Sequence, residues 1–364
     1  MIQDNSTAPN PLISPLAEPL ARQHLDFLDG IRALAALYVM LGHTYLLVFL
    51  DRPVATQLGI RWMLYGHFAV DVFIVLSGFC LALPVAQKGA LRGGAKEFFL
   101  RRARRILPPF YGALMLALAL FFFPRTSPFY PDALHVRHLD PFLIKSILVN
   151  VVLLNDFNTW ATWIDPPFWS VAVEWKIYFL FPLLVWLWLR QGWKVMLLAA
   201  AIIGYGLTGL VHLLFPHFMI FPTCLWYIFL FALGICAAHA AFGKENSVKA
   251  GADPDRRWLW VAGASLALCI GLLIALPIDL GTKVTTDMHV KAYANHLPFI
   301  DAGVGLLFAS CLVLLGRSSR QARPGPGVRA LSWKPLAFLG TFAYSIYLVH
   351  WPLIDVAQAI LFHA

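Results

Sequence analysis

Residues 29–50 read DGIRALAALYVMLGHTYLLVFL, a stretch that is long and apolar enough to cross a bilayer as one helix. It carries Arg32 near one end and His43 well inside. An ionisable side chain at that depth is costly unless it has a partner and a task. At about 100° per residue the two side chains fall on nearly one helical face, roughly 16 Å apart along the axis. We therefore interpret Arg32 and His43 as the two ends of one ligand path.

The composition of the whole chain agrees with that stretch. Of 364 residues, 60% are hydrophobic and only 13% are charged, which is too little charge for the surface of a soluble protein of this size. The sequence predicts an all-α fold, a polytopic transmembrane helix bundle with no soluble domain. The net charge of +9 gives little support to nucleic-acid binding, because the cations cluster in the loops between apolar spans.

Nine stretches are predicted to span the membrane, and a tenth is shorter. The nine are residues 31–50, 66–86, 107–123, 169–189, 194–214, 219–241, 257–276, 296–316 and 335–362. The tenth, residues 141–154, contains Lys145 and is at the low end of the length that a crossing needs. We favour nine full spans with the tenth stretch re-entrant or interfacial, and ten spans is the alternative.

The charges of the loops set the orientation. The loop at residues 87–106 has seven basic residues against one acidic residue, so we expect it to be cytoplasmic. Residues 1–24 are polar and rich in proline, without the order of a signal peptide. We expect them to form a disordered cytoplasmic tail, and residues 25–364 to form the membrane domain.

On this topology three ionisable residues reach a similar depth. His43 lies seven residues before the outer end of its span, and Asp71 and Glu174 each lie five residues after the outer start of theirs. At 1.5 Å per residue, each is roughly 7–10 Å below the outer boundary. The hypothesis is that they form one buried cluster, although the sequence supplies their depth and not their lateral contact.

Five blocks of sequence, spread in order over nearly the whole chain, carry a resemblance to a known family. They are DGIRALAALYVMLGH (29–43), VDVFIVLSGF (70–79), RRARRILPPFY (101–111), FWSVAVEWKIYFLFP (168–182) and YSIYLVHWP (344–352). With these blocks the chain resembles the acyltransferase-3 family of membrane acyltransferases. The resemblance implies transfer of an acyl group, usually acetyl, from cytoplasmic acyl-CoA to a hydroxyl of an exported or surface glycan or another acceptor.

The resemblance also implies roles for particular residues. The family's arginine–histidine pair matches Arg32 and His43, and its glutamate matches Glu174. Its Arg-x-x-Arg element, associated with the acyl donor, falls in a cluster where two pairs fit. These are Arg101 with Arg104 and Arg102 with Arg105. The chain departs from the family at Trp175 and Lys176, where a second acidic or amide residue is common, and nine spans would be one fewer than the usual ten helices.

The chemistry of the residues is consistent with acyl transfer. A sugar hydroxyl is a poor nucleophile, so a base of near-neutral pKa must remove its proton, and histidine suits that role. His43 could instead form a transient acyl-imidazole, and both routes remain open. Glu174 or Asp71 would orient the imidazole and stabilise its charged form. Arg32 and the arginines at 101–105 could grip donor phosphates, and the alternative for Arg32 is a structural pair with Asp29 or Asp26.

Several other residues are expected to have structural roles. Cys80, Cys224, Cys236, Cys269 and Cys311 all lie in apolar spans, without the spacing of metal ligands. His67, at a span edge, needs no special role, and Tyr344 and His350 are expected to pack or line a pocket. No metal and no permanently bound cofactor is predicted, and acetyl-CoA would be a donor substrate.

The function that we predict is an O-acetyltransferase in a bacterial inner membrane, with its N-terminus in the cytoplasm and lipids around it. Its acceptor would be an exported or surface polysaccharide or its lipid-linked precursor, with an exopolysaccharide repeat unit as the first guess. The alternatives are an acyltransferase for a lipid or small molecule, and a proton-coupled transporter that uses His43, Asp71 and Glu174 as a relay.

Overall fold

The computed structural model describes residues 25–49, 59–121, 141–157, 164–214, 223–243, 254–275 and 287–363. In this part of the chain the regular structure is helical and contains no strand, as predicted. The helices are α1 (Asp26–Thr44), η1 (Tyr45–Phe49), η2 (Arg61–Gly66), α3 (His67–Lys88), α4 (Gly94–Phe121), α5 (Pro141–Val151), α6 (Phe168–Gln191), α7 (Trp193–Leu214), α8 (Tyr227–Phe242), α9 (Pro254–Ala275), α10 (Asp287–Ser318), α11 (Pro326–Leu331), α12 (Lys334–Thr341) and α13 (Ala343–His363).

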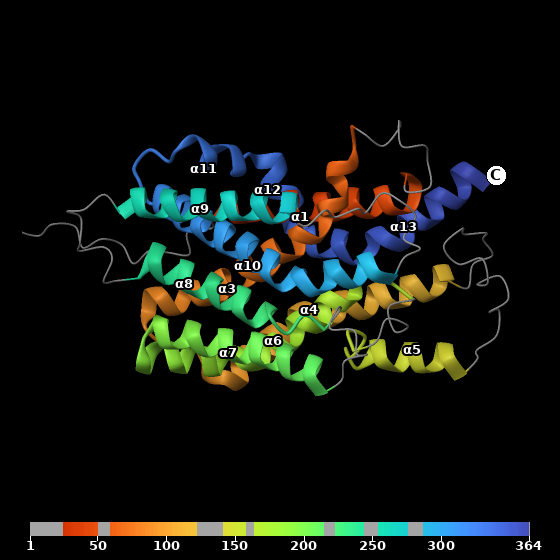
Figure 1. Cartoon of the computed structure of the whole chain (residues 1–364), viewed down its shortest axis with the longest axis horizontal. Helices are drawn as coiled ribbons and strands as arrows, with labels where there is room; N and C mark the ends of the chain where they lie inside the picture. Colours follow the sequence, from red (N-terminus) through yellow and green to blue (C-terminus); the bar gives the residue numbers. More distant parts are fainter. Residues whose placement is uncertain are drawn as a thin grey trace, which may run out of the picture.

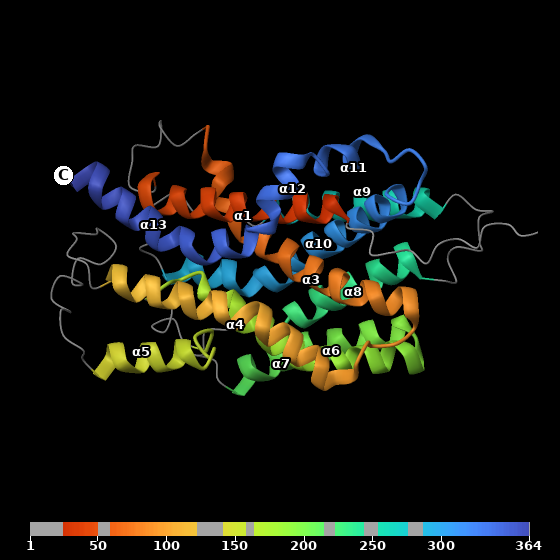
Figure 2. The same ribbon diagram turned by 180° about the vertical axis from the view of Figure 1, so that it is seen from behind.

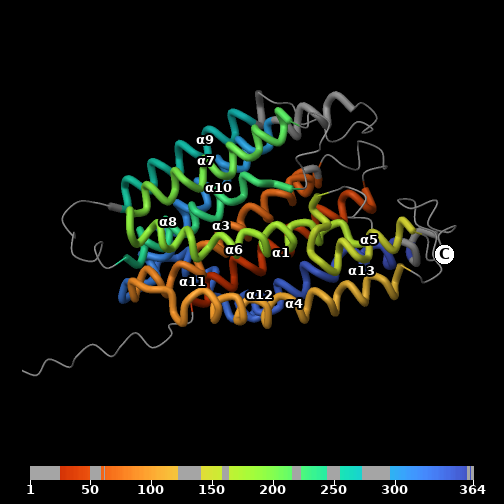
Figure 3. Tube along the Cα trace, turned by 90° about the horizontal axis from the view of Figure 1, so that it is seen from below, coloured from red at the N-terminus to blue at the C-terminus, as the bar shows by residue number. Residues whose placement is uncertain are grey.

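The long helices lie roughly along one common axis and form a bundle (Figure 1), which Figure 2 shows from behind. Helix α1 packs against α3, α12 and α13, and α3 packs against α8 and α10. Seen from below, α7 and α9 lie at one edge of the bundle, and α4 and α12 lie at the other (Figure 3). Helices α1 and α3 therefore lie among the other helices, where ionisable side chains can find partners away from lipid.

Helices α3 and α8 pack closely along each other. A side chain at Gly78 would place its Cβ 2.1 Å from the carbonyl oxygen of Phe231, so only glycine allows the two backbones to approach so closely. Gly78 therefore has a packing role between the two helices. Helix α3 ends at Lys88 because Gly89 adopts a left-handed conformation with φ of 75°, which turns the chain toward the arginine-rich start of α4.

Large apolar side chains also cover the outside of the bundle. Leu198, Ile202 and Leu213 on α7 are all more than half exposed, and so is Met115 on α4. Such an apolar exterior would be a liability in water, and it is expected for helices that face lipid tails.

Six helical segments are long and apolar enough to cross a membrane. They are Asp26–Phe49, Trp62–Lys88, Gly94–Phe121, Phe168–Gln191, Trp193–Leu214 and His296–Ser318. A seventh span is obtained if α12 and the following Ala343–Gln358, bent by 71° at their junction, are counted together. The count of nine to ten spans is therefore not confirmed in the described part of the chain.

The other two expected spans, and the tenth stretch that was favoured as re-entrant or interfacial, differ from these seven in length or composition. Helices α5 and α8 are apolar but have only 11 and 16 residues, and at 1.5 Å per residue α5 extends for about 16 Å. Helix α9 has 22 residues but begins with the charged sequence PDRR and is not among the candidate spans. The predicted tail at residues 1–24 lies outside the described residues.

Candidate functional site

A cavity rich in arginine lies at one end of the bundle, between α1, α3 and α4. Its volume is about 690 Å³. Five arginines and one lysine line it, against two acidic side chains. The basic residues are Arg32, Lys88, Arg92, Arg101, Arg102 and Arg320, and the acidic ones are Asp29 and Glu97. This arginine cavity is thus a concave, positively charged surface, which suits a ligand with several phosphates.

A smaller inner cavity of about 130 Å³ adjoins the arginine cavity. Four residues line both spaces: Arg32, Cys80, Leu81 and Arg102. The inner cavity has hydroxyl and carboxylate groups on its wall, contributed by Ser77, Ser170, Glu174, Tyr178, Tyr344 and Tyr347. A cationic cavity and a polar cavity within the helices therefore lie next to each other and share part of their wall.

Arg32 lies where the two cavities meet. Its guanidinium forms an ion pair with Asp29, one turn earlier on α1, and donates a hydrogen bond of 3.0 Å to Cys80 Sγ on α3. The ion pair is the structural alternative that the sequence left open, and it coexists with the place of Arg32 on both cavity walls. Cys80 is therefore more than a packed cysteine, since it too lines both cavities.

The four arginines near the start of α4 do not all line the same cavity. Arg102 lines both cavities, Arg101 lines the arginine cavity, and Arg105 lines the inner cavity. Arg104 is exposed and lines neither cavity. Arg102 is half-buried, and its Nε has no hydrogen-bond partner in the described part of the chain. Of the two pairs that the sequence allows, Arg102 with Arg105 is the one whose members both reach the inner cavity.

Glu174 belongs to a network on the wall of the inner cavity. The Tyr178 hydroxyl, one turn along α6, donates a hydrogen bond to the Glu174 carboxylate. The Ser77 hydroxyl lies 2.8 Å from the same Tyr178 oxygen. Because the Tyr178 proton is directed to Glu174, the Ser77 hydroxyl is the donor to Tyr178. Helices α3 and α6 thus share a hydrogen-bonded row of three groups beside the arginines.

A second row of polar groups joins α6 to α13. Ser170 Oγ lies 2.6 Å from the Tyr347 hydroxyl, and both side chains line the inner cavity. The Tyr347 ring in turn contacts the His350 ring, with a centroid separation of 5.7 Å. The sequence expected Tyr344 to line a pocket, and this is confirmed.

His43 pairs with another histidine and not with an acid. Its Nδ1 lies 2.7 Å from Nε2 of His350, and the two rings are stacked with centroids 4.9 Å apart. His350 Nδ1 lies 2.6 Å from the carbonyl oxygen of Tyr347, which can only accept, so this nitrogen must carry a proton. With both rings neutral, His350 Nε2 is then an acceptor and His43 Nδ1 is the donor. The network therefore leaves the lone pair on Nε2 of His43.

The surroundings of His43 complete this geometry. The edge of Trp351 packs on the ring at a centroid distance of 5.0 Å. His43 keeps part of its surface accessible, yet it is not among the residues that line either cavity. Tyr347 and His350 connect it to the inner cavity. His350 was expected only to pack or line a pocket, although the block YSIYLVHWP already marked its segment.

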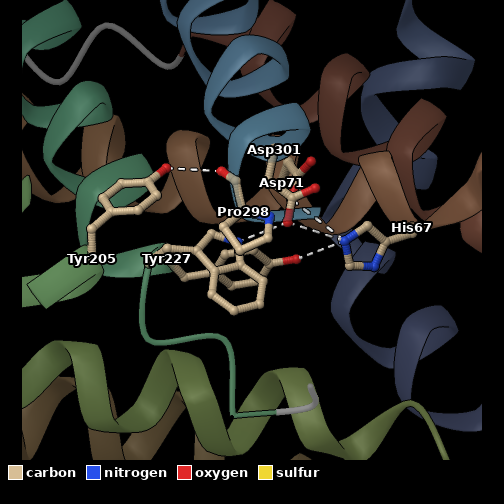
Figure 4. A network of polar contacts seen from close by, with 7 residues as sticks. His67, Asp71, Tyr205, Tyr227, Pro298 and Asp301 are labelled. Carbon is tan, nitrogen blue, oxygen red and sulfur yellow. Dashed lines mark hydrogen bonds and ion pairs between the residues drawn. The ribbon is translucent and has the colours of Figure 1, made fainter. Parts of the chain in front are cut away.

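The structure does not bring His43, Asp71 and Glu174 together in one hydrogen-bonded cluster. His43 contacts His350, Glu174 contacts Tyr178, and Asp71 lies with His67 and Asp301 (Figure 4). The expectation of one cluster used depth alone, whereas the direction in which each side chain leaves its helix depends on packing. Neither carboxylate is hydrogen-bonded to the imidazole that it was expected to orient.

The loop that precedes α6 carries buried charge. Lys176, which stands where the family often has an acid or amide, forms an ion pair with Asp156. Burial raises the pKa of Asp156, and the nearby Lys176 acts against that rise. Burial raises the pKa of Asp165 well above its ordinary value, and neither of its carboxylate oxygens has a hydrogen-bond partner in the described residues.

Comparison with known proteins decides the family. A family model described as an acyltransferase domain (Acyl_transf_3) matches residues 25–364. The chain belongs to the acyltransferase-3 family. This match covers all five sequence blocks and every residue of the two cavities.

Curated relatives in this family are about twice as long as the match. The peptidoglycan O-acetyltransferase OatA of Listeria monocytogenes is 24% identical over 375 residues, which cover 94% of this chain and 51% of the relative. The O-acetyltransferase OatA of Staphylococcus aureus is 24% identical over 91% of this chain and 51% of the relative. The putative peptidoglycan O-acetyltransferase YrhL of Bacillus subtilis is 24% identical over 93% and 50%. The chain thus spans about half the length of these relatives, and no solved structure matches it.

Proposed function

We propose that this acyltransferase-3 protein is a multi-pass membrane O-acetyltransferase that moves an acetyl group from acetyl-CoA to a hydroxyl of a cell-envelope glycan. The observation that carries the proposal is that the arginine cavity and the inner cavity adjoin, with Arg32 and Arg102 on the walls of both. The names of the relatives support an acetyl group and a glycan acceptor.

The arginine cavity is the proposed donor site. A coenzyme A molecule carries its phosphates at one end and its thioester at the end of a long, narrow arm. Five arginines in a cavity of about 690 Å³ suit the phosphate end, and the adjoining 130 Å³ suits the arm. The arginines also orient the protein, because basic residues are retained on the cytoplasmic side. The donor would therefore enter from the cytoplasm of a cell whose plasma membrane holds the bundle, with α1 beginning on that side.

His43 is the proposed general base. Its Nε2 takes the proton from the acceptor hydroxyl while the oxygen attacks the thioester carbonyl, so that a C–O bond forms and the C–S bond breaks. The leaving thiolate then takes the proton from the imidazolium. His350 acts as a positioning residue, because its Nε2 accepts from His43 Nδ1 and fixes the tautomer that has a basic Nε2. This arrangement uses a neutral imidazole in the place that a carboxylate has in hydrolase triads.

Glu174 has a different proposed role from the one that the sequence suggested. It holds Tyr178, and through it Ser77, on the wall of the inner cavity where the donor arm would lie. Hydroxyl groups fixed in this way can hydrogen-bond the amide groups of the arm. We therefore assign Glu174 to donor positioning.

The acceptor enters from the other side of the membrane in this proposal. The relatives' names favour peptidoglycan over the exopolysaccharide repeat unit that was the first guess. Both acceptors are sugar hydroxyls outside the cytoplasm, so both fit the same chemistry. Mass spectrometry of ester-linked acetate on each purified glycan separates the two.

The test compares cells that lack the gene with cells that express the wild type, His43→Ala or His239→Ala. His239 lies on α8 against Trp188, lines neither cavity and serves as the matched control. We expect ester-linked acetate on one envelope glycan with the wild type and the control, and its loss with His43→Ala at equal protein level in the membrane. Unchanged acetate on every glycan after deletion would refute the function. Retained acetate with His43→Ala would remove that residue from the chemistry.

A further inference from the structure

A second group of chemically able side chains lies away from the two cavities. His67 is the first residue of α3, Asp71 follows it by one helical turn, and Asp301 comes from α10 (Figure 4). His67 Nε2 is 3.3 Å from Asp301 Oδ2 and 4.0 Å from Asp71 Oδ1. One ligand atom from each residue lies within 4.8 Å of the other two. None of the three lines the arginine cavity or the inner cavity.

Both carboxylates of this group are fully buried and poorly satisfied. Asp71 and Asp301 are 0% exposed. Neither oxygen of Asp71 has a hydrogen-bond partner in the described part of the chain, and the same is true of Asp301 Oδ1. Buried carboxylate oxygens are normally hydrogen-bonded or bound to a cation, so three such oxygens at one place indicate a missing positive partner.

Within the residues that the structure describes, little positive charge faces this pair of carboxylates. In the described residues, the ion-pair partner of both carboxylates is His67, and no lysine or arginine pairs with either. Two ionised carboxylates carry two negative charges, and a single monovalent cation beside them would cancel only one. A divalent cation would cancel both at once.

We propose that His67, Asp71 and Asp301 bind a divalent transition-metal ion, with Zn²⁺ as the first choice and Mn²⁺ as the second. Imidazole and carboxylate together suit these ions better than Mg²⁺ or Ca²⁺, which prefer oxygen alone. Ligands at about 2.1 Å in a tetrahedron are roughly 3.4 Å apart, close to the separations of 3.3 and 4.0 Å seen here. His67 and Asp71 are four residues apart on α3, the spacing at which two residues on one helix face bind Zn²⁺ in H-E-x-x-H sites, and Asp301 supplies a third ligand from another helix.

The groups around the three ligands support this assignment. Trp226 Nε1 donates a hydrogen bond of 2.8 Å to Asp301 Oδ2, which orients that carboxylate as outer-shell donors do at metal sites. The Tyr227 hydroxyl lies 3.3 Å from His67 Nε2, which puts a further polar group beside the three ligands. The side chain of His67 is 16% exposed, so the group is not sealed from the exterior.

The proposed ion also has a structural consequence. It would join α3 to α10 and hold both beside the start of α8, because Trp226 and Tyr227 contact its ligands. The sequence predicted no metal, since His67 and Asp301 are 234 residues apart and no spacing along the chain connects them. Only the packing of α10 on α3 brings the three ligands together.

The experiment measures metal bound to the purified full chain, without reference to activity. The protein is purified in detergent with a tag that contains no histidine and without chelators, and its metal content is determined by inductively coupled plasma mass spectrometry. We expect about one Zn²⁺ or Mn²⁺ per chain for the wild type. Asp71→Asn and Asp301→Asn should lower this at least about tenfold, because each removes a ligand and its charge. His43→Ala should keep the ion, which separates this site from the proposed catalysis.

Asp255→Asn is the matched control, since Asp255 on α9 pairs with Arg317 and lies outside the group. It should retain the wild-type metal content. The proposal is overturned if the wild type holds no divalent ion both as purified and after incubation with Zn²⁺ and desalting, which would indicate that the carboxylates share protons instead. It is also overturned if folded Asp71→Asn and Asp301→Asn proteins keep the full content. Should these variants fail to fold, Co²⁺ titration of the chelator-treated wild type decides, because binding gives visible absorption bands and their absence rejects the site.

Discussion

Replacing His350 tests the arrangement at His43 most directly. Phe at position 350 has nearly the volume of histidine and can keep the stacking with His43, but it has no acceptor for the proton on His43 Nδ1. Gln at the same position offers an amide oxygen close to where Nε2 of His350 lies. The pair His350→Phe and His350→Gln therefore separates the hydrogen bond from the packing, in a residue that is only 3% exposed.

The magnitude follows from the contact that is lost. A hydrogen bond of 2.7 Å joins the two rings, and its removal leaves a buried donor without a partner. That costs about 1–3 kcal/mol, and it also releases the tautomer that keeps Nε2 of His43 basic. If the loss falls on the transition state, it corresponds to a fall of about 5- to 150-fold in kcat. His350→Gln should restore most of that, whereas KM for acetyl-CoA should change little in both variants.

The assay follows the release of CoA thiol from acetyl-CoA in membrane vesicles supplied with solubilised peptidoglycan fragments, with ester-linked acetate on the fragments measured in parallel. His239→Gln is the control, because His239 lines neither cavity and contacts Trp188. Wild-type kcat in His350→Phe would refute the reasoning. Equal losses in the folded Phe and Gln variants would also refute it, since they would assign His350 a purely structural role.

Three further predictions concern donor binding and stability. Glu174→Ala should lower kcat/KM for acetyl-CoA by roughly tenfold, because the Tyr178 hydroxyl loses its acceptor. Glu174→Gln should lower kcat/KM less, because its amide oxygen can still accept. Equal losses in the two variants would contradict the positioning role of Glu174. Arg102→Ala should raise KM for acetyl-CoA about tenfold or more, and the exposed Arg104→Ala should not, so equal effects would relocate the donor site. Asp165→Asn should raise the thermal midpoint in detergent at pH 8 more than at pH 4.5. Burial raises the pKa of Asp165 in the folded chain, so stability is present below the ordinary carboxyl pKa of about 4 and is lost as pH rises toward the folded value. A pH-independent gain would contradict that sign.

Some properties of this protein are determined by the sequence itself. The apolar stretches predict the membrane helices, and the basic loop around Arg101–Arg105 predicts a cationic surface, because length, hydropathy and charge act locally and add along the chain. The five sequence blocks also indicate the family, which the family model confirms. The sequence therefore indicates Arg32 and Arg102, the two arginines that line both cavities.

The number of spans shows where sequence reasoning loses precision. Residues 219–241 and 257–276 are apolar enough to be predicted as crossings, yet α8 is short and α9 begins with charged residues. Residues 335–362 form a pair of helices with a bend of 71°. Hydropathy averages over such a bend, because it responds to composition and not to direction.

Only the tertiary structure decided which ionisable groups meet. Depth in the membrane is one coordinate, and it follows from the position of a residue along its span. The lateral coordinate depends on the packing of helices that are far apart in the sequence, such as α1 with α13 and α3 with α10. For this reason His43 contacts His350, which is 307 residues away, and Asp71 lies beside Asp301. Depth alone predicts a different group, in which His43 and Asp71 lie with Glu174. The position of a side chain along its helix follows from the sequence, but which side chain it contacts depends on how the neighbouring helix packs.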